Sequence, residues 1–415
     1  MKTNSDTRKH VAVVATTAKM VRFFLVHHIV ALSKDYNITV ICNLSGQEKC
    51  LDILPDTVEI YNLAIKRNVD IFSDVKSLLM LIFFFYKRDF VATYSISPKG
   101  GVLCAVSAWF TAVPVRVHTF TGQVWVVKKG LKRSFLKYLD RLTSMLSTIT
   151  IVDSASQKDF LESQHVVKKN KALVIGYGSI SGVDVKIFHP DKSVRSEVRS
   201  NMDVQDSATV FLFVGRLKKD KGIFELVESF SRICKKTPNA ELWLVGDDEE
   251  NIEKELDSCI SKTICNIRFI AYTTSPEKYM KAADVFCLPS YREGFGTSII
   301  EAASCGIPSI GSRIYGIIDA IIENKTGLLV NVGSVDELTF GMLEMAKNHF
   351  LRRKMGKAAA INALEKFDSS RVTDELLLIL KEKIGKDAVF KNLSYSYWCN
   401  WFYWSKICMF TRYKC

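Results

Sequence analysis

The sequence predicts an α/β fold with two Rossmann-like domains that face each other across a cleft. The chain has 415 residues, which suits two domains of ordinary size. Short β-branched segments alternate with stretches of helical spacing in two successive series, a pattern typical of parallel sheets covered by helices. A polar stretch over 191–207 separates the two series. It has eleven charged or hydroxyl side chains among its seventeen residues, and we expect it to be a linker region.

The first series opens as a strand–helix–strand unit. His10–Ala15 and Ile38–Cys42 are short apolar and β-branched runs, and Leu25–Leu32 between them has helical spacing. The loop Thr16–Lys19 has no glycine, so the G-x-G-x-x-G fingerprint is absent and an NAD enzyme is not expected. The later strands predicted for this series are Val115–His118, Thr148–Val152 and Ala172–Ile175.

The second series repeats the pattern of short strands followed by helices. Gly215 and Gly246 come directly after its first two strands. Ligands of such parallel sheets bind beyond the carboxyl ends of the strands, so we expect the functional residues in the loops at those ends. The predicted strands are Thr209–Val214, Glu241–Val245, Ile267–Ile270 and Val285–Leu288.

Charge and cysteine content narrow the class of protein. Lys and Arg total 57 against 44 Asp and Glu, a net charge of +13, which indicates an anionic partner: nucleic acid, an acidic membrane surface or a phosphorylated ligand. The 11 cysteines form no C-x-x-C pair, which argues against a disulfide framework or a zinc ribbon and favours a reducing cytosol. The polar N-terminus predicts no signal peptide. The longest apolar run, Leu78–Tyr86, is too short to span a membrane and is predicted to be a buried helix or strand rather than a membrane dip.

One candidate motif, Gly215–Gly222, directly follows a predicted strand. The G-x-x-x-x-G-K-[ST] order of a P-loop is missing. Glycine lets the backbone pass close to a ligand, and Arg216 and Lys221 bracket the strand end and the next helix. A forked guanidinium and a compact ammonium together suit a diphosphate. The alternative is a solvated basic turn.

A second candidate motif, Pro289–Ala302, follows the strand Val285–Leu288. We expect a helix to begin near Thr297, and the unpaired N–H groups at a helix start form an anion site. Glu293 precedes this helix and Glu301 lies one turn inside it, so the two carboxylates flank that site and are placed to bind sugar hydroxyls. The alternative is that Ser298-x-x-Glu301 forms a capping box.

Together the two motifs resemble the C-terminal domain of family 4 glycosyltransferases, the retaining nucleotide-sugar enzymes of the GT-B fold. The similarity is strong over about 207–332, continues more weakly elsewhere, and extends to bacterial O-antigen and other surface-polysaccharide enzymes. Besides Gly215–Gly222 and the pair Glu293 and Glu301, the segments that carry it are Asp284–Phe286, Pro289–Ser290, Gly306–Pro308, Thr326–Val330, Ser95–Gly101, His118–Trp125 and Gly182–Pro190.

The resemblance implies a role for each matching residue. Arg216 and Lys221 would hold the donor diphosphate, Glu293 the hydroxyls of the transferred sugar, and Glu301 the nucleotide ribose. The donor, expected to be a UDP-sugar, is a substrate, so no cofactor is implied. The remaining donor contacts implied are the backbone at Gly294, Phe295, Gly296 and Thr297, and Tyr272 beside uracil.

The sequence departs from the family at two places: the first loop lacks the usual glycines, and the usual histidine of one motif is replaced. Many relatives have T-x-H-G after the strand that here ends at His118, whereas this chain reads Thr119–Gly122. Thr121 therefore occupies the histidine position and His118 lies three residues earlier, so either residue is a candidate to face the donor; His118 is otherwise a packing residue. No D-x-D occurs, which fits a metal-independent GT-B enzyme with no bound metal.

The family also implies a domain organisation. Residues 1–190 would bind the acceptor and the membrane, 208–365 would bind the nucleotide sugar, and a helix over 366–385 would cross back to the first domain. A basic, aromatic tail over 386–415 follows.

Two basic segments indicate a membrane surface. In 128–142, a face of Leu131, Phe135, Leu139 and Leu142 lies opposite a basic stripe of Lys129, Arg133, Lys137 and Arg141. The tail combines cations with aromatics that include Trp398, Trp401 and Trp404, the composition of a membrane interface. The alternatives are a solvated helix face and packing of the tail between domains. Because the donor motif indicates a nucleotide-sugar ligand, no nucleic-acid partner is expected. We expect a peripheral enzyme on the inner face of the cytoplasmic membrane, with a lipid-linked glycan acceptor.

Two other functions compete with a transferase. A GT-B-type nucleotide-sugar epimerase or hydrolase would need no lipid site, and the basic aromatic tail argues against it. A non-catalytic sugar-nucleotide-binding protein is supported only by the displaced histidine, whereas the intact Arg216, Lys221, Glu293 and Glu301 argue for catalysis.

Overall fold

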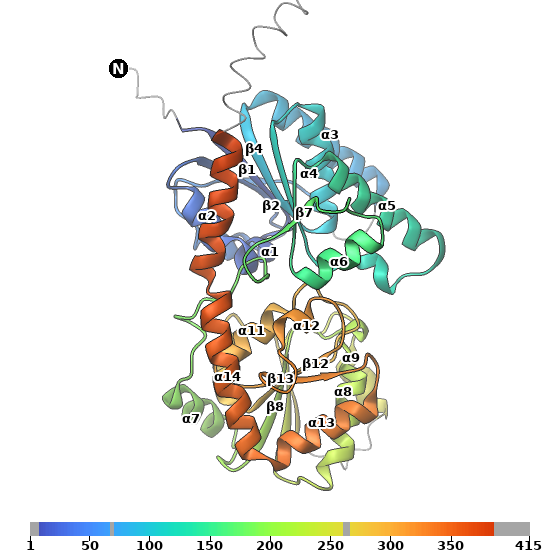
Figure 1. Ribbon diagram of the computed structural model, residues 1–415, viewed down its shortest axis with the longest axis vertical. Coiled ribbons are helices and arrows are strands. Elements are labelled where there is room, and N and C mark those ends of the chain that lie inside the picture. The colour runs from blue at the N-terminus through green and yellow to red at the C-terminus, as the bar shows by residue number, and fades with distance from the viewer. Residues whose placement is uncertain (1–7, 67–69, 260–265, 386–415) are drawn as a thin grey trace, which may run out of the picture.

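The structure is a computed structural model that describes residues 8–66, 70–259 and 266–385. Its first domain contains a seven-stranded parallel sheet of order β3-β2-β1-β4-β5-β6-β7 (Figure 1). The interior strand β1 is buried because its residues Val11–Ala15 are all apolar and covered by helices on both faces. The strands are β1 (His10–Thr17), β2 (Asn37–Asn43), β3 (Glu59–Asn62), β4 (Phe90–Ile96), β5 (Val115–Phe120), β6 (Ile149–Val152) and β7 (Ala172–Val174). The helices are α1 (Ala18–Phe24), α2 (Val26–Leu32), α3 (Ile71–Lys87), α4 (Pro98–Phe110), α5 (Gly130–Leu146) and α6 (Ala155–Ser163).

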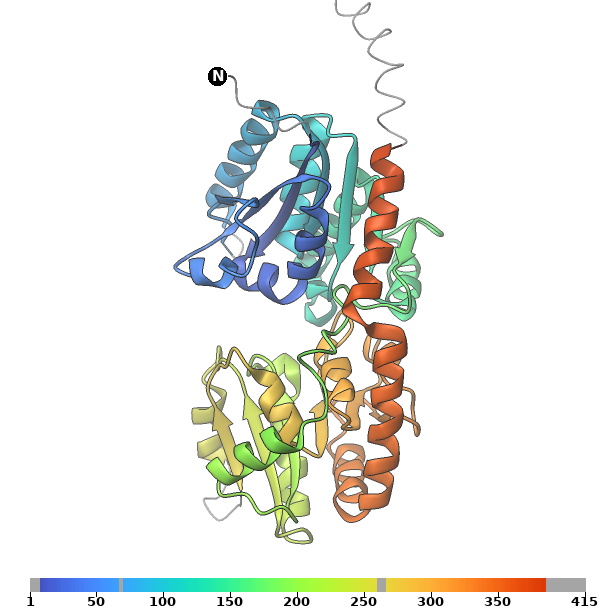
Figure 2. The same cartoon turned by 90° about the vertical axis from the view of Figure 1, so that its left-hand side faces the viewer.

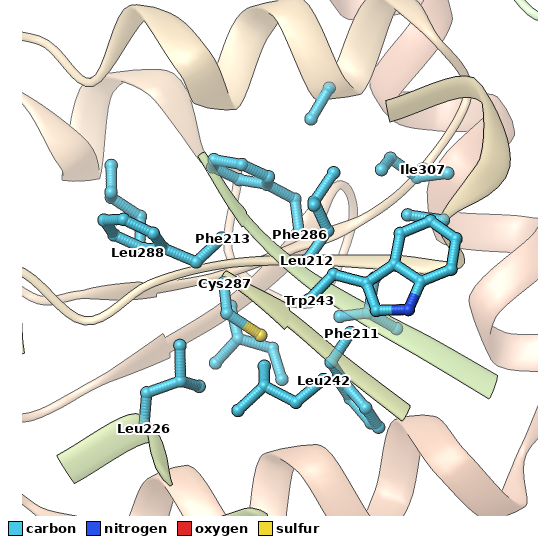
Figure 3. Packing of buried hydrophobic residues seen from close by; sticks show 14 of the residues in the cluster. Phe211, Leu212, Phe213, Leu226, Leu242, Trp243, Phe286, Cys287, Leu288 and Ile307 are labelled. Carbon is cyan, nitrogen blue, oxygen red and sulfur yellow. The ribbon is translucent and has the colours of Figure 1, made fainter. Parts of the chain in front are cut away.

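The second domain contains a six-stranded parallel sheet of order β10-β9-β8-β11-β12-β13. Large side chains of its three central strands, among them Phe211, Trp243 and Phe286, pack into one core (Figure 3). The strands are β8 (Thr209–Val214), β9 (Ala240–Val245), β10 (Ile267–Ile270), β11 (Val285–Leu288), β12 (Ser309–Ser312) and β13 (Gly327–Val330). The helices are α7 (Lys192–Asn201), α8 (Ile223–Cys234), α9 (Ile252–Cys259), α10 (Pro276–Ala282), α11 (Thr297–Ser304), α12 (Ile317–Ala320), α13 (Val335–Lys347) and α14 (His349–Phe367).

Both domains are therefore doubly wound, and the predicted fold class is confirmed. Every predicted strand forms within two residues of its expected bounds. The sequence analysis missed β3, β4, β12 and β13. β3 is a largely exposed edge strand and β12 reads Ser-Ile-Gly-Ser, so neither has the apolar run that identifies a strand.

The last helical segment crosses back to the first domain, as predicted (Figure 2). The chain bends at Asp368, which pairs with Val183, and continues as a helix over 369–385. Val372, Leu376 and Leu380 of this helix are buried in the core of the first domain. The chain thus passes between the two domains near Val183 and again near Asp368.

The polar stretch 191–207 is not a linker region. Its first half forms α7, and the Arg199 guanidinium, 1% exposed, lies 2.6 Å from Asp284 Oδ2 and donates to the Ala282 carbonyl. Burial of an arginine is stable here because each guanidinium nitrogen has an acceptor. The polar composition therefore reflects ion pairs with the second domain.

The apolar run Leu78–Tyr86 lies in α3 and is only half buried. Leu81, Phe84 and Phe85 face the sheet, whereas Phe83 and Tyr86 are 62% and 78% exposed. The prediction of a buried element is thus correct for one face of the helix and wrong for the other. Among the described residues, no helix has both the length and the apolar character needed to cross a membrane.

Candidate functional site

The loops after β8 and β11 meet at the carboxyl edge of the second sheet, beside its topological switch point. Lys221 Nζ lies 2.5 Å from Glu293 Oε1, and the Ser290 hydroxyl donates to the same carboxylate oxygen at 2.9 Å. Gly222 permits this approach: its φ is +70°, and a Cβ there would lie 2.2 Å from the Pro289 carbonyl oxygen. The structure thus brings together one predicted residue from each motif.

Arg216, the other predicted cation, points elsewhere. Its guanidinium is 3.4 Å from Glu249 Oε2, and its side chain is 38% exposed. This long, solvated contact is weak. Arg216 is therefore near the strand end but available to another anion, whereas Lys221 is already paired.

The helix start at Thr297 has the character predicted from the second motif. Gly296 precedes α11 with φ +82°, and no side chain caps the helix. The capping box of Ser298 and Glu301 therefore does not form. Among the described residues, the N–H groups of Gly294, Phe295 and Gly296 donate to no acceptor, which leaves them free to bind an anion. The Phe295 side chain itself is buried against Phe367.

Glu301 lies in the first turns of α11. Burial raises its pKa to about 7, and the nearby charge of Glu277 raises it further in the same direction. A hydroxyl group that donates a hydrogen bond to this buried carboxylate would stabilise its charged form and lower its pKa.

The first domain closes against this site at Gly122, in the loop after β5. A Cβ on Gly294 would lie 2.8 Å from the Gly122 nitrogen and 2.5 Å from Asp153 Oδ2, so only glycine fits. Arg292 spans the cleft: it donates to the Gly122 carbonyl at 3.3 Å and lies 3.0 Å from Asp220 Oδ2.

Asp153, directly after β6, is a site residue that the sequence analysis missed. It is buried, and burial raises its pKa to about 8. Its Oδ1 has no hydrogen-bond partner within the described part of the chain. Its position at the end of a predicted strand was the one available signal.

The structure separates the two residues proposed for the altered family position. His118 is 1% exposed in β5, where its Nδ1 is 3.0 Å from Ser95 Oγ and burial lowers its pKa to about 3. It is thus placed as a packing histidine. Thr121 is next to Gly122 at the cleft, and its carbonyl accepts from Gln123 and Gln157.

A second contact across the cleft involves Tyr272, which follows β10. Lys19 of the first domain lies with Nζ 4.3 Å from the centre of the Tyr272 ring and 3.0 Å from Asp247 Oδ2. Lys19, predicted to lie in a loop without glycine, is in the first turn of α1, and its ammonium group contacts the second domain.

An aromatic stack also joins the domains. The Trp125 and Phe160 rings are 5.5 Å apart, and the Phe160 and Tyr315 rings are 4.5 Å apart. Beside them the Gly316 N–H donates to the Ser156 hydroxyl at 2.8 Å.

The described residues contain no group of three or more His, Cys, Asp or Glu side chains arranged to hold a metal ion. A cationic side chain and unpaired N–H groups are thus the anion-binding groups that the site offers.

Comparison with known proteins places the chain among sugar-transferring enzymes. The profile described as "Glycosyl transferases group 1" matches residues 194–361. The chain is 31% identical over 329 residues, 78% of its length and 86% of the relative's, to the capsular polysaccharide biosynthesis glycosyltransferase CapM of Staphylococcus aureus. It is 26% identical, over 77% of its length and 82% of the relative's, to the Escherichia coli UDP-Gal:alpha-D-GlcNAc-diphosphoundecaprenol alpha-1,3-galactosyltransferase. In fold it is similar to Anabaena Alr3699/HepE in complex with UDP and glucose, with a TM-score of 0.75, 18% identity, and coverage of 90% of this chain and 100% of the other.

Proposed function

The chain belongs to the group 1 glycosyl transferases, and on that premise we propose that it is a retaining, metal-independent hexosyltransferase with a UDP-sugar donor. The observation that carries the proposal is the ion pair of Lys221 and Glu293 beside the unpaired N–H groups at the start of α11. These groups supply positive charge next to a carboxylate, the combination needed to bind a sugar diphosphate.

In this proposal each group of the site has a separate task. Lys221 and Arg216 hold the diphosphate, and the N–H groups of 294–296 and the start of α11 at Thr297 add partial positive charge. As the glycosidic bond breaks, negative charge grows on the leaving diphosphate, and these groups stabilise it without a metal. Glu293 then holds hydroxyls of the transferred sugar, and Glu301 holds the ribose.

The first domain would supply the other side of the reaction. Thr121 and Gly122 lie against the donor loop, and Asp153 places a buried carboxyl beside Gly294. Tyr272, capped by Lys19, is the proposed neighbour of uracil. The contacts across the cleft hold the domains together, and a closed cleft excludes water and so suppresses hydrolysis of the donor.

The proposed acceptor is a lipid-linked or polysaccharide glycan, in the synthesis of lipopolysaccharide O-antigen or capsule. Two relatives support it by name: one acts in capsular polysaccharide biosynthesis, and another transfers galactose to a diphosphoundecaprenol-linked sugar. An acceptor of this kind is confined to the membrane, so its enzyme must reach the membrane surface.

The surface of the first domain supports a membrane location. Helix α4 packs between α3 and α5 (Figure 1), and the outer sides of these three helices form what we call the apolar face. Phe72 and Leu131 are each 91% exposed on it. Single exposed apolar side chains are ordinary on a soluble protein, whereas a group of them on neighbouring helices indicates an interaction surface. Its other exposed members are Ile71, Val75, Leu79, Phe83, Tyr86, Trp109, Phe110, Phe135, Tyr138 and Met145.

The orientation of α5 is the reverse of an ordinary packed amphipathic helix. Asp140, Thr143 and Ser144 are its buried residues, whereas Leu131 and Phe135 point outward. The basic stripe runs beside α6: Arg133 and Lys137 lie over the Trp125 ring, at 5.8 and 5.5 Å, and Lys129 and Arg141 are exposed.

We propose that the apolar face enters the lipid interface and that the basic stripe meets anionic headgroups. Cations flanking an exposed apolar surface fit an anionic leaflet, here the inner face of the cytoplasmic membrane. The aromatic tail, proposed as a second anchor, lies outside the described residues.

The experiment is to incubate the protein with a panel of nucleotide sugars and lipid extracts and to identify the pair that gives product. We expect a UDP-sugar to react with a lipid-linked acceptor, activity to survive EDTA, and the α configuration of the donor to be retained. Release of free sugar without transfer would instead indicate a hydrolase. An inverted product, or loss of activity in EDTA, would contradict the proposed mechanism.

A further inference from the structure

A cavity of about 780 Å³ opens between α5 and α6, at the end of α6 away from the cleft. None of the residues assigned to the donor site lines it. Its floor includes Val166 and Val167, both buried. Its rim carries Arg141, Lys168 and Lys169, all exposed. The cavity thus combines an apolar floor with a basic rim.

The cations of this cavity exceed its carboxylates. Arg141, Lys168, Lys169 and Lys171 face two acidic groups, and one of these, Glu162, already accepts the backbone N–H of Asn170 at 2.9 Å. No ion pair of Arg141, Lys168 or Lys169 occurs among the described residues. The rim therefore has an unneutralised positive charge.

Lys171 adds a further cation to the lining of the cavity. Its ammonium is partly buried and donates to the Ser144 carbonyl in the last turn of α5. Burial lowers its pKa, and the positive charges of Lys168 and Arg116 lower it further. A bound anion would relieve this repulsion.

The cavity adjoins the apolar face. Met145, 60% exposed, lines the cavity and is also a member of that face, and Arg141 belongs to both the basic stripe and the rim. When the apolar face lies on a bilayer, the cavity is at the level of the headgroups.

We propose that this cavity binds the phosphate group of an anionic membrane lipid. Arg141, with its forked donors, and the two exposed lysines contact the phosphate. This site rests on the proposed membrane location and would fix the rotation of the enzyme on the bilayer, so that the cleft faces a lipid-linked acceptor.

The test is calorimetry with monomeric dihexanoyl phosphatidylglycerol, glycerol 1-phosphate and dihexanoylglycerol. The full chain is compared with the triple variant R141Q/K168Q/K169Q and with R353Q/K354Q/K357Q, which removes the same charges from α14. We expect the phosphatidylglycerol to bind most tightly, and the cavity variant to lose on the order of 10²-fold in affinity, since three cations are removed. The α14 variant should bind as the unmodified protein does.

Each other outcome has a definite meaning. Equal affinity for glycerol 1-phosphate would overturn the lipid source and assign the cavity to soluble phosphate esters. Binding of dihexanoylglycerol alone, no binding at all, or equal losses in the two variants would overturn the phosphate site. Titration of the same preparations with UDP tests the donor site independently of the lipid site. The cavity variant should bind UDP as the unmodified protein does. Failure of the unmodified protein to bind UDP would count against the donor site and not against the cavity.

Discussion

Lys221 Nζ and Glu293 Oε1 lie 2.5 Å apart, although the residues are 72 positions apart in the chain. Both side chains are largely shielded from solvent, at 12% and 16% exposure. In the proposed mechanism the lysine must bind a diphosphate and the carboxylate must bind sugar hydroxyls. The ion pair therefore holds both side chains in place before the donor binds. In this mechanism the bound donor replaces it with a lysine–diphosphate contact and a carboxylate–hydroxyl contact.

Loss of either phosphate-binding cation should slow the reaction. We expect Lys221→Ala or Arg216→Ala to lower kcat/KM by about 10²–10³, because each removes a charge contact to the leaving diphosphate. Lys219→Ala is the matched control, since Lys219 is in the same loop but 58% exposed and paired with Glu255. Initial rates with a saturating acceptor measure the effect. Unchanged rates in both site variants would refute the assignment.

The two carboxylates should be separable by UDP affinity. Glu301→Gln should weaken UDP because the ribose loses its acceptor, whereas Glu293→Gln should leave UDP affinity nearly unchanged and impair transfer. Calorimetry with UDP measures the first effect and steady-state rates the second. Normal UDP binding by the Glu301 variant would remove that residue from the donor site.

Binding of UDP should release a proton near neutral pH. Burial raises the pKa of Glu301 to about 7 in the free protein, and ribose hydroxyls donating to its carboxylate would lower that pKa. UDP affinity should therefore rise with pH up to about pH 7 and level off above it. Calorimetry in two buffers of different ionisation enthalpy measures the proton count, and Glu301→Gln should abolish the difference between buffers. A proton count of zero in the unmodified protein would rule out this linkage.

Stability should fall as pH rises, in part because of Asp140. Burial raises its pKa to about 7, although the Trp125 N–H donates to it at 2.8 Å. A raised folded-state pKa means that the unfolded chain gives up this proton first, so stability is lost between about pH 4 and 7. Asp140→Asn should flatten the fall in Tm from about pH 4 to 7, whereas Asp374→Asn, on an exposed site, should not. Equal slopes in all three proteins would show that Asp140 does not titrate in this way.

Membrane binding should depend on the apolar face. Phe72→Glu or Leu131→Glu should weaken binding to anionic vesicles by about 10- to 100-fold, since each removes an apolar side chain worth about 1.5–3 kcal/mol on insertion. The loss should persist at high salt, which screens charges but not apolar contacts. Phe350→Glu is the control, because Phe350 is 78% exposed on the second domain. If all three variants sediment alike with vesicles, the apolar face does not contact lipid.

The sequence alone determined the two parallel sheets and the loops that carry the chemistry. β1, β8 and β11 are runs of apolar residues bounded by polar or glycine positions, and this local pattern is sufficient to identify a strand. Arg216, Lys221, Glu293 and Glu301 lie in the segments that follow β8 and β11, so their location near the carboxyl edge of a sheet also followed from local information. Short or polar strands such as β12 lack the pattern and were missed.

Only the tertiary structure decided which of these residues meet and which surfaces face water. Asp153 and Lys19 enter the cleft because the first domain folds against the second, and no local spacing encodes that approach. Helix α5 shows the same limit: its periodicity defines an apolar and a basic side, but Trp125 bonds to Asp140 and Gln164 to Lys137, so polar residues pack inward while Leu131 and Phe135 stay exposed. Periodicity gives the faces of an element, whereas the neighbours that cover each face come from contacts distant in sequence.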